Sequence, residues 1–111
     1  MAIDKSLLSG STAMLLLKLL SQQDMYGYEM IETLRLRSRN VFELKAGTLY
    51  PLLHSLEAKD LLTVYEKEVT GKIRKYYRIT KKGKQALAEK QEAWNTYAEA
   101  VVNVLSLEAM A

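Results

Sequence analysis

The sequence of 111 residues has no cysteine, and it has one proline, one tryptophan and one histidine. Without cysteine it can form neither disulfides nor thiolate metal sites, and His54 alone cannot build a multi-histidine site. This usage is compatible with a reducing cytoplasm, where we expect the protein to act without a metal or other cofactor. An enzyme is not expected, since the sequence shows no nucleophile–base pair, phosphate-cradling glycine loop or metal cluster.

Long hydrophobic runs are also missing. The richest run, Ala13 to Leu20, is interrupted by Lys18 and falls short of the ~18 apolar residues that a membrane span needs. The first five residues lack the basic and apolar segments of a signal peptide. We therefore expect no membrane partner. With 49% hydrophobic and 26% charged residues, the composition fits one globular domain.

Positive charge is concentrated in one short stretch, although the net charge is only +3. Residues 1–60 carry seven basic and seven acidic residues. Residues 61–90 carry nine basic and three acidic residues, a net of +6, and residues 91–111 carry three acidic and no basic residues. Such a patch favours a polyanion, because neutralised phosphates release counterions. A solvated surface is the alternative, so the patch needs a structural context.

Hydrophobic spacing predicts three short helices in the first half of the chain. The first, over about residues 5–21, is apolar on most of its surface, and we interpret its second buried side as contact with a partner chain. The second covers about residues 26–37, with apolar residues three and four apart. The third starts at Gly47 or Thr48, with Pro51 in its first turn, and ends at Asp60.

The period then changes to that of strands. Residues 62–69 and 73–79 alternate around a turn at residues 70–72, which predicts a hairpin with a basic second strand. Thr80 is the expected N-cap of a last helix over about residues 81–107, whose near-heptad apolar spacing predicts packing along another helix. The predicted fold is mainly α with a small β-hairpin. It comprises a winged helix-turn-helix in residues 1–80, with the third helix entering the major groove, and a dimerisation helix in residues 81–111.

Three motifs keep an order and spacing that resemble the PadR family of transcriptional regulators. They are residues 26–30 (YGYEM), residues 47–53 (GTLYPLL) and residues 74–83 (RKYYRITKKG), and the resemblance spans about residues 12–88. The single C-terminal helix is similar to the small branch of that family. Within this branch, Trp94 resembles the tryptophan of the multidrug-binding regulators of the LmrR type. The resemblance implies a DNA-binding regulator.

For DNA contact at the third helix, the candidates are Lys45, Thr48 and Tyr50, which can meet phosphates or base edges. The alternative makes Thr48 a helix cap and Tyr50 a half-buried packing residue. Tyr26, at the start of the second helix, is a candidate phosphate contact, although a core or hinge role is an equal alternative. For His54, an exposed position without function is favoured over a base contact.

For the wing, the candidates are Lys72, Arg74 and Lys75 around the hairpin turn, which can follow the phosphate backbone. The alternative is a hairpin edge protected by charge. The chain departs from the family pattern at Ile73, because many members carry proline near this turn. We therefore expect a less rigid wing tip.

The resemblance also implies a ligand slot at the dimer interface. Two copies of Trp94 would form the walls of a flat apolar slot, and simple dimer core is the alternative. The other candidates for its lining are Leu7, Ser11, Met14, Leu17 and Ala98.

The function expected is that of a repressor that binds a palindromic operator in double-stranded DNA as a homodimer. A planar aromatic or drug-like effector in the slot would release it, which makes multidrug binding part of the hypothesis. The alternative is a winged-helix module that binds proteins and senses no ligand, and the +6 stretch argues against it.

Overall fold

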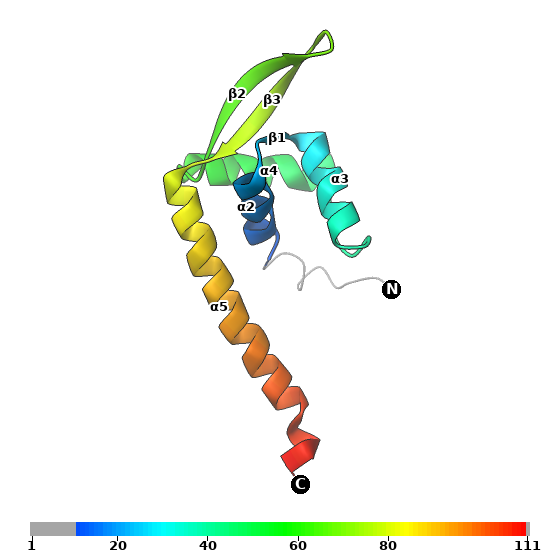
Figure 1. Ribbon diagram of the computed structural model, residues 1–111, viewed down its shortest axis with the longest axis vertical. Helices are drawn as coiled ribbons and strands as arrows, with labels where there is room; N and C mark the ends of the chain where they lie inside the picture. Colours follow the sequence, from blue (N-terminus) through cyan, green and yellow to red (C-terminus); the bar gives the residue numbers. More distant parts are fainter. Residues whose placement is uncertain (1–10, 111) are drawn as a thin grey trace.

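The computed structural model describes residues 11–110, and Figure 1 shows how its elements are arranged. Their bounds are α2 (Thr12–Gln22), β1 (Met25–Tyr26), α3 (Gly27–Arg37), α4 (Ala46–Ala58), β2 (Leu62–Val69), β3 (Lys72–Ile79), α5 (Lys81–Leu105) and the short 3-10 helix η1 (Leu107–Met110). Three helices, a hairpin and a long helix follow one another as predicted. The predicted fold class, a winged helix-turn-helix with a long C-terminal helix, is confirmed.

A third strand joins the hairpin, which the periodicity of the sequence did not reveal. The two residues of β1 pair antiparallel with β3, Met25 opposite Tyr77 and Tyr26 opposite Tyr76. The strand order is therefore β1-β3-β2. Because Gly27 begins α3 directly after β1, the sheet is tied to the start of that helix.

The hairpin turn is one residue shorter than predicted. Val69 pairs with Lys72, so Thr70 and Gly71 alone form the turn. Both have positive φ, 49° and 79°, as a type I′ turn requires, and this turn matches the right-handed twist of the strands. The wing is thus a regular two-residue hairpin.

Helix α4 begins at Ala46, earlier than the predicted start at Gly47 or Thr48. Lys45 is its N-cap and Ala46 its first residue, so Pro51 lies in the second turn and not in the first. Proline here removes the hydrogen bond to the carbonyl of Gly47. Both residues are exposed, so water can satisfy that carbonyl.

The core forms where α2, α3, α4 and the inner side of the sheet meet. Its fully buried leucine and methionine side chains are Leu16, Leu17, Leu20, Met30, Leu49, Leu53 and Leu62. Helix α2 lies at its centre and contacts α3, β3 and α5 of the same chain. Contacts within the chain therefore account for much of the burial of this helix, and its contact with a partner chain stays a prediction.

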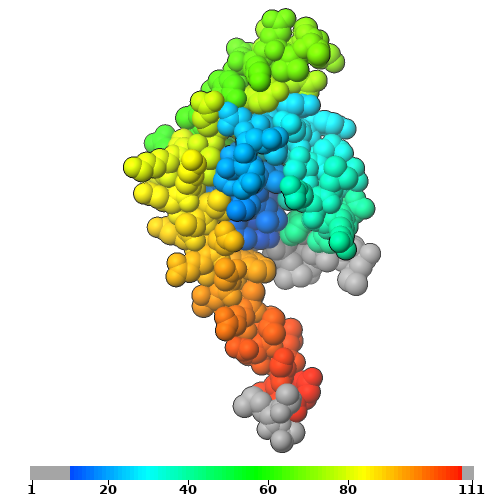
Figure 2. All heavy atoms as spheres, viewed as in Figure 1, coloured from blue at the N-terminus to red at the C-terminus, as the bar shows by residue number. Residues whose placement is uncertain are grey.

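Helix α5 starts on the body of the protein and then leaves it. The side chain of Thr80 caps it, because its Oγ1 accepts the Gly83 N–H at 2.9 Å and donates to the Asp60 carbonyl at 2.6 Å. Leu87 still packs on the core, whereas the second half of the helix projects alone (Figure 2). The radius of gyration is accordingly 16.3 Å, against about 13 Å for a compact chain of this length.

None of the helices within residues 11–110 is long and apolar enough to cross a membrane.

Candidate nucleic-acid interface

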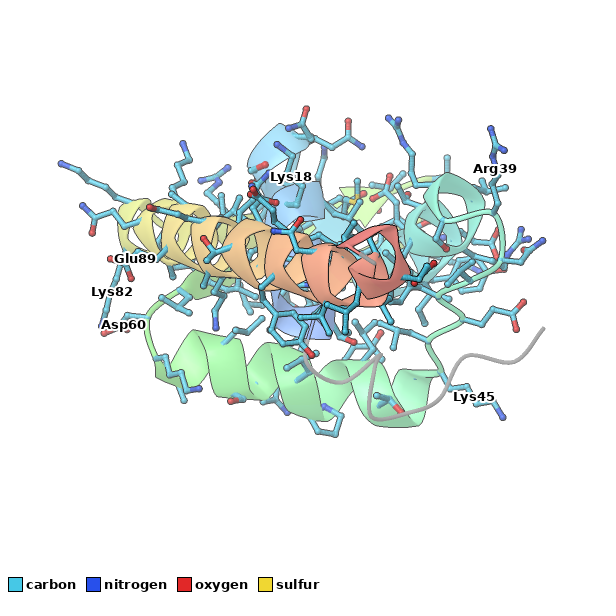
Figure 3. The ribbon with its side chains drawn as sticks, turned by 90° about the horizontal axis from the view of Figure 1, so that it is seen from below. Lys18, Arg39, Lys45, Asp60, Lys82 and Glu89 are labelled. Atoms are coloured by element: carbon cyan, nitrogen blue, oxygen red, sulfur yellow. The ribbon has the colours of Figure 1, made fainter. Side chains whose placement is uncertain are left out.

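Helix α4 presents one polar face to solvent. Leu49, Leu53 and Leu56 point into the core, and the residues between them are mostly exposed. Lys45 and Thr48 lie on the exposed part of the first turn, and His54 lies one turn beyond Tyr50. No side chain caps α4, so Thr48 is not used as a cap. Figure 3 shows Lys45 at the end of α4, pointing away from the body.

Tyr50 connects α4 with the start of α3. Tyr50 is 40% exposed, and its phenol end lies directly against Gly27, where a Cβ atom would overlap the hydroxyl. Glycine is therefore needed at position 27 for the two helices to approach. Tyr26 precedes it as the N-cap, and its backbone N–H is 3.4 Å from Glu29 Oε1. A phosphate at this point would therefore meet the tyrosine hydroxyls more readily than that N–H.

Arg74 brings the wing to the same place. Its guanidinium lies over the ring of Tyr26, 4.2 Å from the ring centroid. Three predicted residues from three separate motifs thus lie around the start of α3, since Tyr50 contacts Gly27 and Arg74 lies over the ring of the neighbouring Tyr26. A cation and two phenol groups near the junction of α3, α4 and the wing are side chains suited to contact with a phosphate backbone.

The two faces of the wing carry different charges. Residues directly opposite in an antiparallel pair lie on the same face, and successive residues alternate between faces. The outer face, directed away from the core, comprises Thr63, Tyr65, Lys67, Val69, Lys72, Arg74, Tyr76 and Arg78. It has four cations and no carboxylate.

The inner face has the opposite character near the tip. Glu66 and Glu68 lie there, and Lys75 is paired opposite Glu66. The predicted wing residues are therefore divided, since Lys72 and Arg74 share the outer face and Lys75 lies on the inner one.

Lys67 and Arg78 belong to the outer face but were not among the sequence candidates. Strand alternation could have identified both. Arg78 is four residues from Arg74 and so lies on the same face, and Lys67 is the cross-strand partner of Arg74. The register that pairs the strands was needed to apply it. Lys67 extends the row of cations along the wing, and Arg78 adds a cation at its base.

Asp24 neutralises the base of the outer face. Its Oδ2 accepts hydrogen bonds from Tyr65 Oη at 2.6 Å and Arg78 Nε at 3.0 Å. Burial alone would raise the pKa of Asp24, but these hydrogen bonds together lower it below its ordinary value. The hydrogen bond to Asp24 also raises the pKa of Tyr65, which stays a donor. On the outer face, Lys72 and Arg74 therefore form no ion pair with a carboxylate of the described residues, and Lys67 interacts with Asp24 through its charge alone.

A pocket of about 340 Å³ lies between α2 and α5. Its lining is Ser11, Met14, Leu15, Lys18, Phe42, Leu87, Gln91, Trp94 and Asn95. Trp94 is 47% exposed here. In Figure 3, Lys18 of this pocket lies on the opposite side of α5 from α4.

Three of the predicted slot residues, Ser11, Met14 and Trp94, line this pocket. Leu17 does not, because its side chain points into the core and is completely buried. Ala98 is also absent from the lining, one turn beyond the pocket. Leu7 lies outside the described residues. Sequence reasoning missed Phe42, which stands in an irregular connector without periodicity.

A larger groove of about 910 Å³ runs beside this pocket between α2 and α3. The two share Leu15, Lys18 and Phe42, and Arg37 adds a second cation to the groove. Among residues 11–110, no cluster of histidine and carboxylate side chains could hold a metal ion.

Both the sequence and the structure of this chain are similar to those of known proteins. Residues 16–89 match the model of the transcriptional regulator PadR-like family. A transcriptional regulator from Clostridium thermocellum has a similar structure, with a TM-score of 0.83 and 30% identity over 88% of this chain and 96% of that one. A PadR family transcriptional regulator from Eggerthella lenta gives 0.78 and 33% identity over 90% of this chain and 86% of that one.

The chain is also similar to the transcriptional regulator Rv3488 of Mycobacterium tuberculosis. The two are 42% identical over 65 residues, which are 59% of this chain and 61% of that protein. These named proteins regulate transcription and are not enzymes.

Proposed function

This chain belongs to the PadR-like family of transcriptional regulators, and we propose that it is a DNA-binding repressor that acts as a homodimer on a palindromic operator and is released by an aromatic effector. The observation that carries the proposal is the gathering of Tyr26, Tyr50 and Arg74 around the start of α3, beside a wing face whose two strands contribute four cations and no carboxylate. A module that binds only proteins needs no such surface.

In the proposed complex, the exposed face of α4 enters the major groove and the wing follows the adjacent backbone. Two copies of α4 would lie about 34 Å apart, one helical turn of DNA. The residues proposed to contact DNA are Tyr26, Lys45, Thr48, Tyr50, Lys67, Lys72, Arg74, Lys75 and Arg78. We expect the smallest contributions from Lys75, which lies opposite Glu66, and Arg78, which is paired with Asp24.

Replacing both Lys72 and Arg74 with alanine is expected to weaken binding to every DNA sequence and to flatten its salt dependence. Each lost phosphate contact lowers the slope of log K against log salt by about 1, so the double variant should lose about 2. Fluorescence anisotropy with a labelled duplex at several salt concentrations measures both quantities.

The matched control for this experiment is Lys90→Ala, which removes an exposed cation from α5, far from the wing. Its salt slope should equal that of the unmodified protein. An unchanged slope in the wing variant would remove the wing from the contact set. Absence of DNA binding by the unmodified protein even at low salt would favour the protein-interaction module instead.

The homodimer proposal rests on α5. Its projecting half exposes apolar side chains at three- and four-residue spacing, including Trp94, Tyr97, Val101, Val104 and Leu105. Isolated in water, such a strip is unfavourable, and a second copy would cover it. The acidic residues of the last 21 positions also complement the two cations of the groove between α2 and α3. We therefore propose that the projecting half of one α5 lies along that groove of its partner.

The effector proposal rests on the pocket at Trp94, whose lining is mostly apolar and aromatic. Lys18 is the only charged residue among the described residues that line it. A flat ring would pack on the indole, and the ammonium would favour a negative substituent. We therefore propose a planar aromatic anion as the effector, bound in a slot of the LmrR type, and a planar cation as a poor ligand.

Titration of the single tryptophan tests this ligand class. Cinnamate should quench its fluorescence saturably, near one ligand per two chains, and bind roughly three- to tenfold more tightly than cinnamylamine, which has the same ring and the opposite charge. Lys18→Gln should remove that preference and leave the quenching by the ring. Equal binding of both compounds to the unmodified protein would contradict the role of Lys18. No response to either would leave Trp94 as part of the dimer core.

A further inference from the structure

Three tyrosines on the outer face of the wing form a continuous row across all three strands. The centroids of Tyr26 and Tyr76 are 5.5 Å apart in an edge-to-face arrangement, and those of Tyr76 and Tyr65 are 5.7 Å apart and nearly parallel. Each strand contributes one ring, from β1, β3 and β2 in turn. We refer to Tyr26, Tyr76 and Tyr65 as the tyrosine ladder.

One cation lies against each ring of the ladder. Arg74 covers the ring of Tyr26 at 4.2 Å, Arg78 covers that of Tyr65 at 4.9 Å, and the Lys67 ammonium lies 5.4 Å from the centroid of Tyr76. A platform for unpaired bases would need open ring faces. Here each ring contacts a cation of the protein and a neighbouring ring, which indicates an internal support.

The ladder lies where the sheet changes from three strands to two. Strand β1 ends at Tyr26, opposite Tyr76, and beyond this pair the hairpin continues as two strands only. A two-stranded hairpin is marginally stable alone. Tyr65, at the other end of the ladder, donates a hydrogen bond to Asp24, which directly precedes β1. The ladder therefore supports the wing at the point where it leaves the body.

We infer that Tyr76, the central ring, is a positioning residue for DNA binding, which holds the cations of the wing tip at a fixed place relative to α4. This inference rests on the proposed DNA-binding function. Ile73, which is 69% exposed, stands near the tip where many family members carry proline. In this chain the ladder would therefore limit the movement of the wing in place of a proline. Packing at the base of the hairpin limits how far the residues of its tip can move.

A double-mutant cycle separates this role from a direct contact or a general loss of stability. Tyr76→Leu should weaken binding to a random-sequence duplex at low salt roughly three- to tenfold, whereas Tyr76→Phe keeps the ring and should bind like the unmodified protein. Lys72 lies four residues from Tyr76 along β3, which is about 13 Å at the rise of a strand. Lys72→Ala should lose at least half of its effect, in log units, in the Tyr76→Leu background. Additive effects would overturn the inference.

Hydrogen exchange of the wing amides supplies a readout that does not require DNA. In Tyr76→Leu, the amides of residues 66–75 should exchange faster while those of α2 are unchanged, and Tyr76→Phe should restore protection. If the unmodified protein fails to bind DNA but this pattern appears, the proposed function fails and the ladder remains a support of the wing. If exchange is unchanged in Tyr76→Leu, the supporting role is wrong regardless of DNA binding.

Discussion

Gly83→Ala is expected to destabilise the protein by about 3 kcal/mol and to lower its Tm by roughly 10 °C, as overpacking against backbone does. Gly83 lies in the first turn of α5, where a Cβ atom would overlap the carbonyl oxygen of Leu61 and lie 2.7 Å from Ile79 Cγ1. That carbonyl accepts the Thr80 N–H at 3.0 Å, so it cannot move without losing the hydrogen bond that aligns α5.

The matched control is Gly47→Ala, because a Cβ at that exposed position of α4 meets nothing within 4 Å. Since alanine favours a helix more than glycine does, this variant should be more stable by up to about 1 kcal/mol. Thermal unfolding followed by circular dichroism compares the two. If Gly83→Ala unfolds within a degree or two of the unmodified protein, the close contact between α5 and Leu61 is wrong.

Most of the fold follows from the sequence because its main elements are long and regular. The alternation of residues 62–69 predicts β2 with its observed bounds, and Thr80 predicts the start of α5. The period of the apolar residues carries this information directly. The predicted start of α4 was less accurate. Pro51 was placed in the first turn of this helix, whereas the first turn begins at Ala46 and Pro51 lies in the second.

What the sequence could not predict depends on contacts between distant segments. Strand β1 has two residues, too few to alternate, and it exists only because β3 pairs with it. The apolar density of α2 indicated burial on several sides. The fold was needed to show that α3, β3 and α5 of the same chain provide much of that burial. Leu17 is the clearest example, since it was placed in a slot between chains and lies in the core.

The candidate site shows the same division. Motifs in three segments named Tyr26, Tyr50 and Arg74, which the structure brings together. The register of the hairpin then separated Lys75 from Lys72, which no reading of charge along the chain could do. Whether these residues contact DNA is a proposal that the wing variants test.

Val101→Asp is expected to convert the proposed dimer to a monomer at micromolar concentration. Val101 lies in the exposed apolar strip of α5, between Tyr97 and Leu105, and is 38% exposed in the single chain. A carboxylate buried in an apolar interface without a partner costs several kcal/mol, which is at least a hundredfold in the dissociation constant. Binding to a palindromic duplex should fall by a similar factor, because the second half-site is no longer reached by a linked copy. Sedimentation velocity and anisotropy measure the two effects.

Asn103→Asp introduces the same charge at an exposed position of α5, about 200° around the helix from Val101, and is the matched control. It should remain a dimer and keep its affinity for DNA. Both variants should retain their helix content, because each substitution replaces an exposed side chain that is not part of the core. A Val101→Asp protein that stays dimeric would show that the dimer does not form through this strip. A monomer that still binds the palindrome with full affinity would separate DNA binding from dimerisation, because each winged helix would then bind its half-site independently.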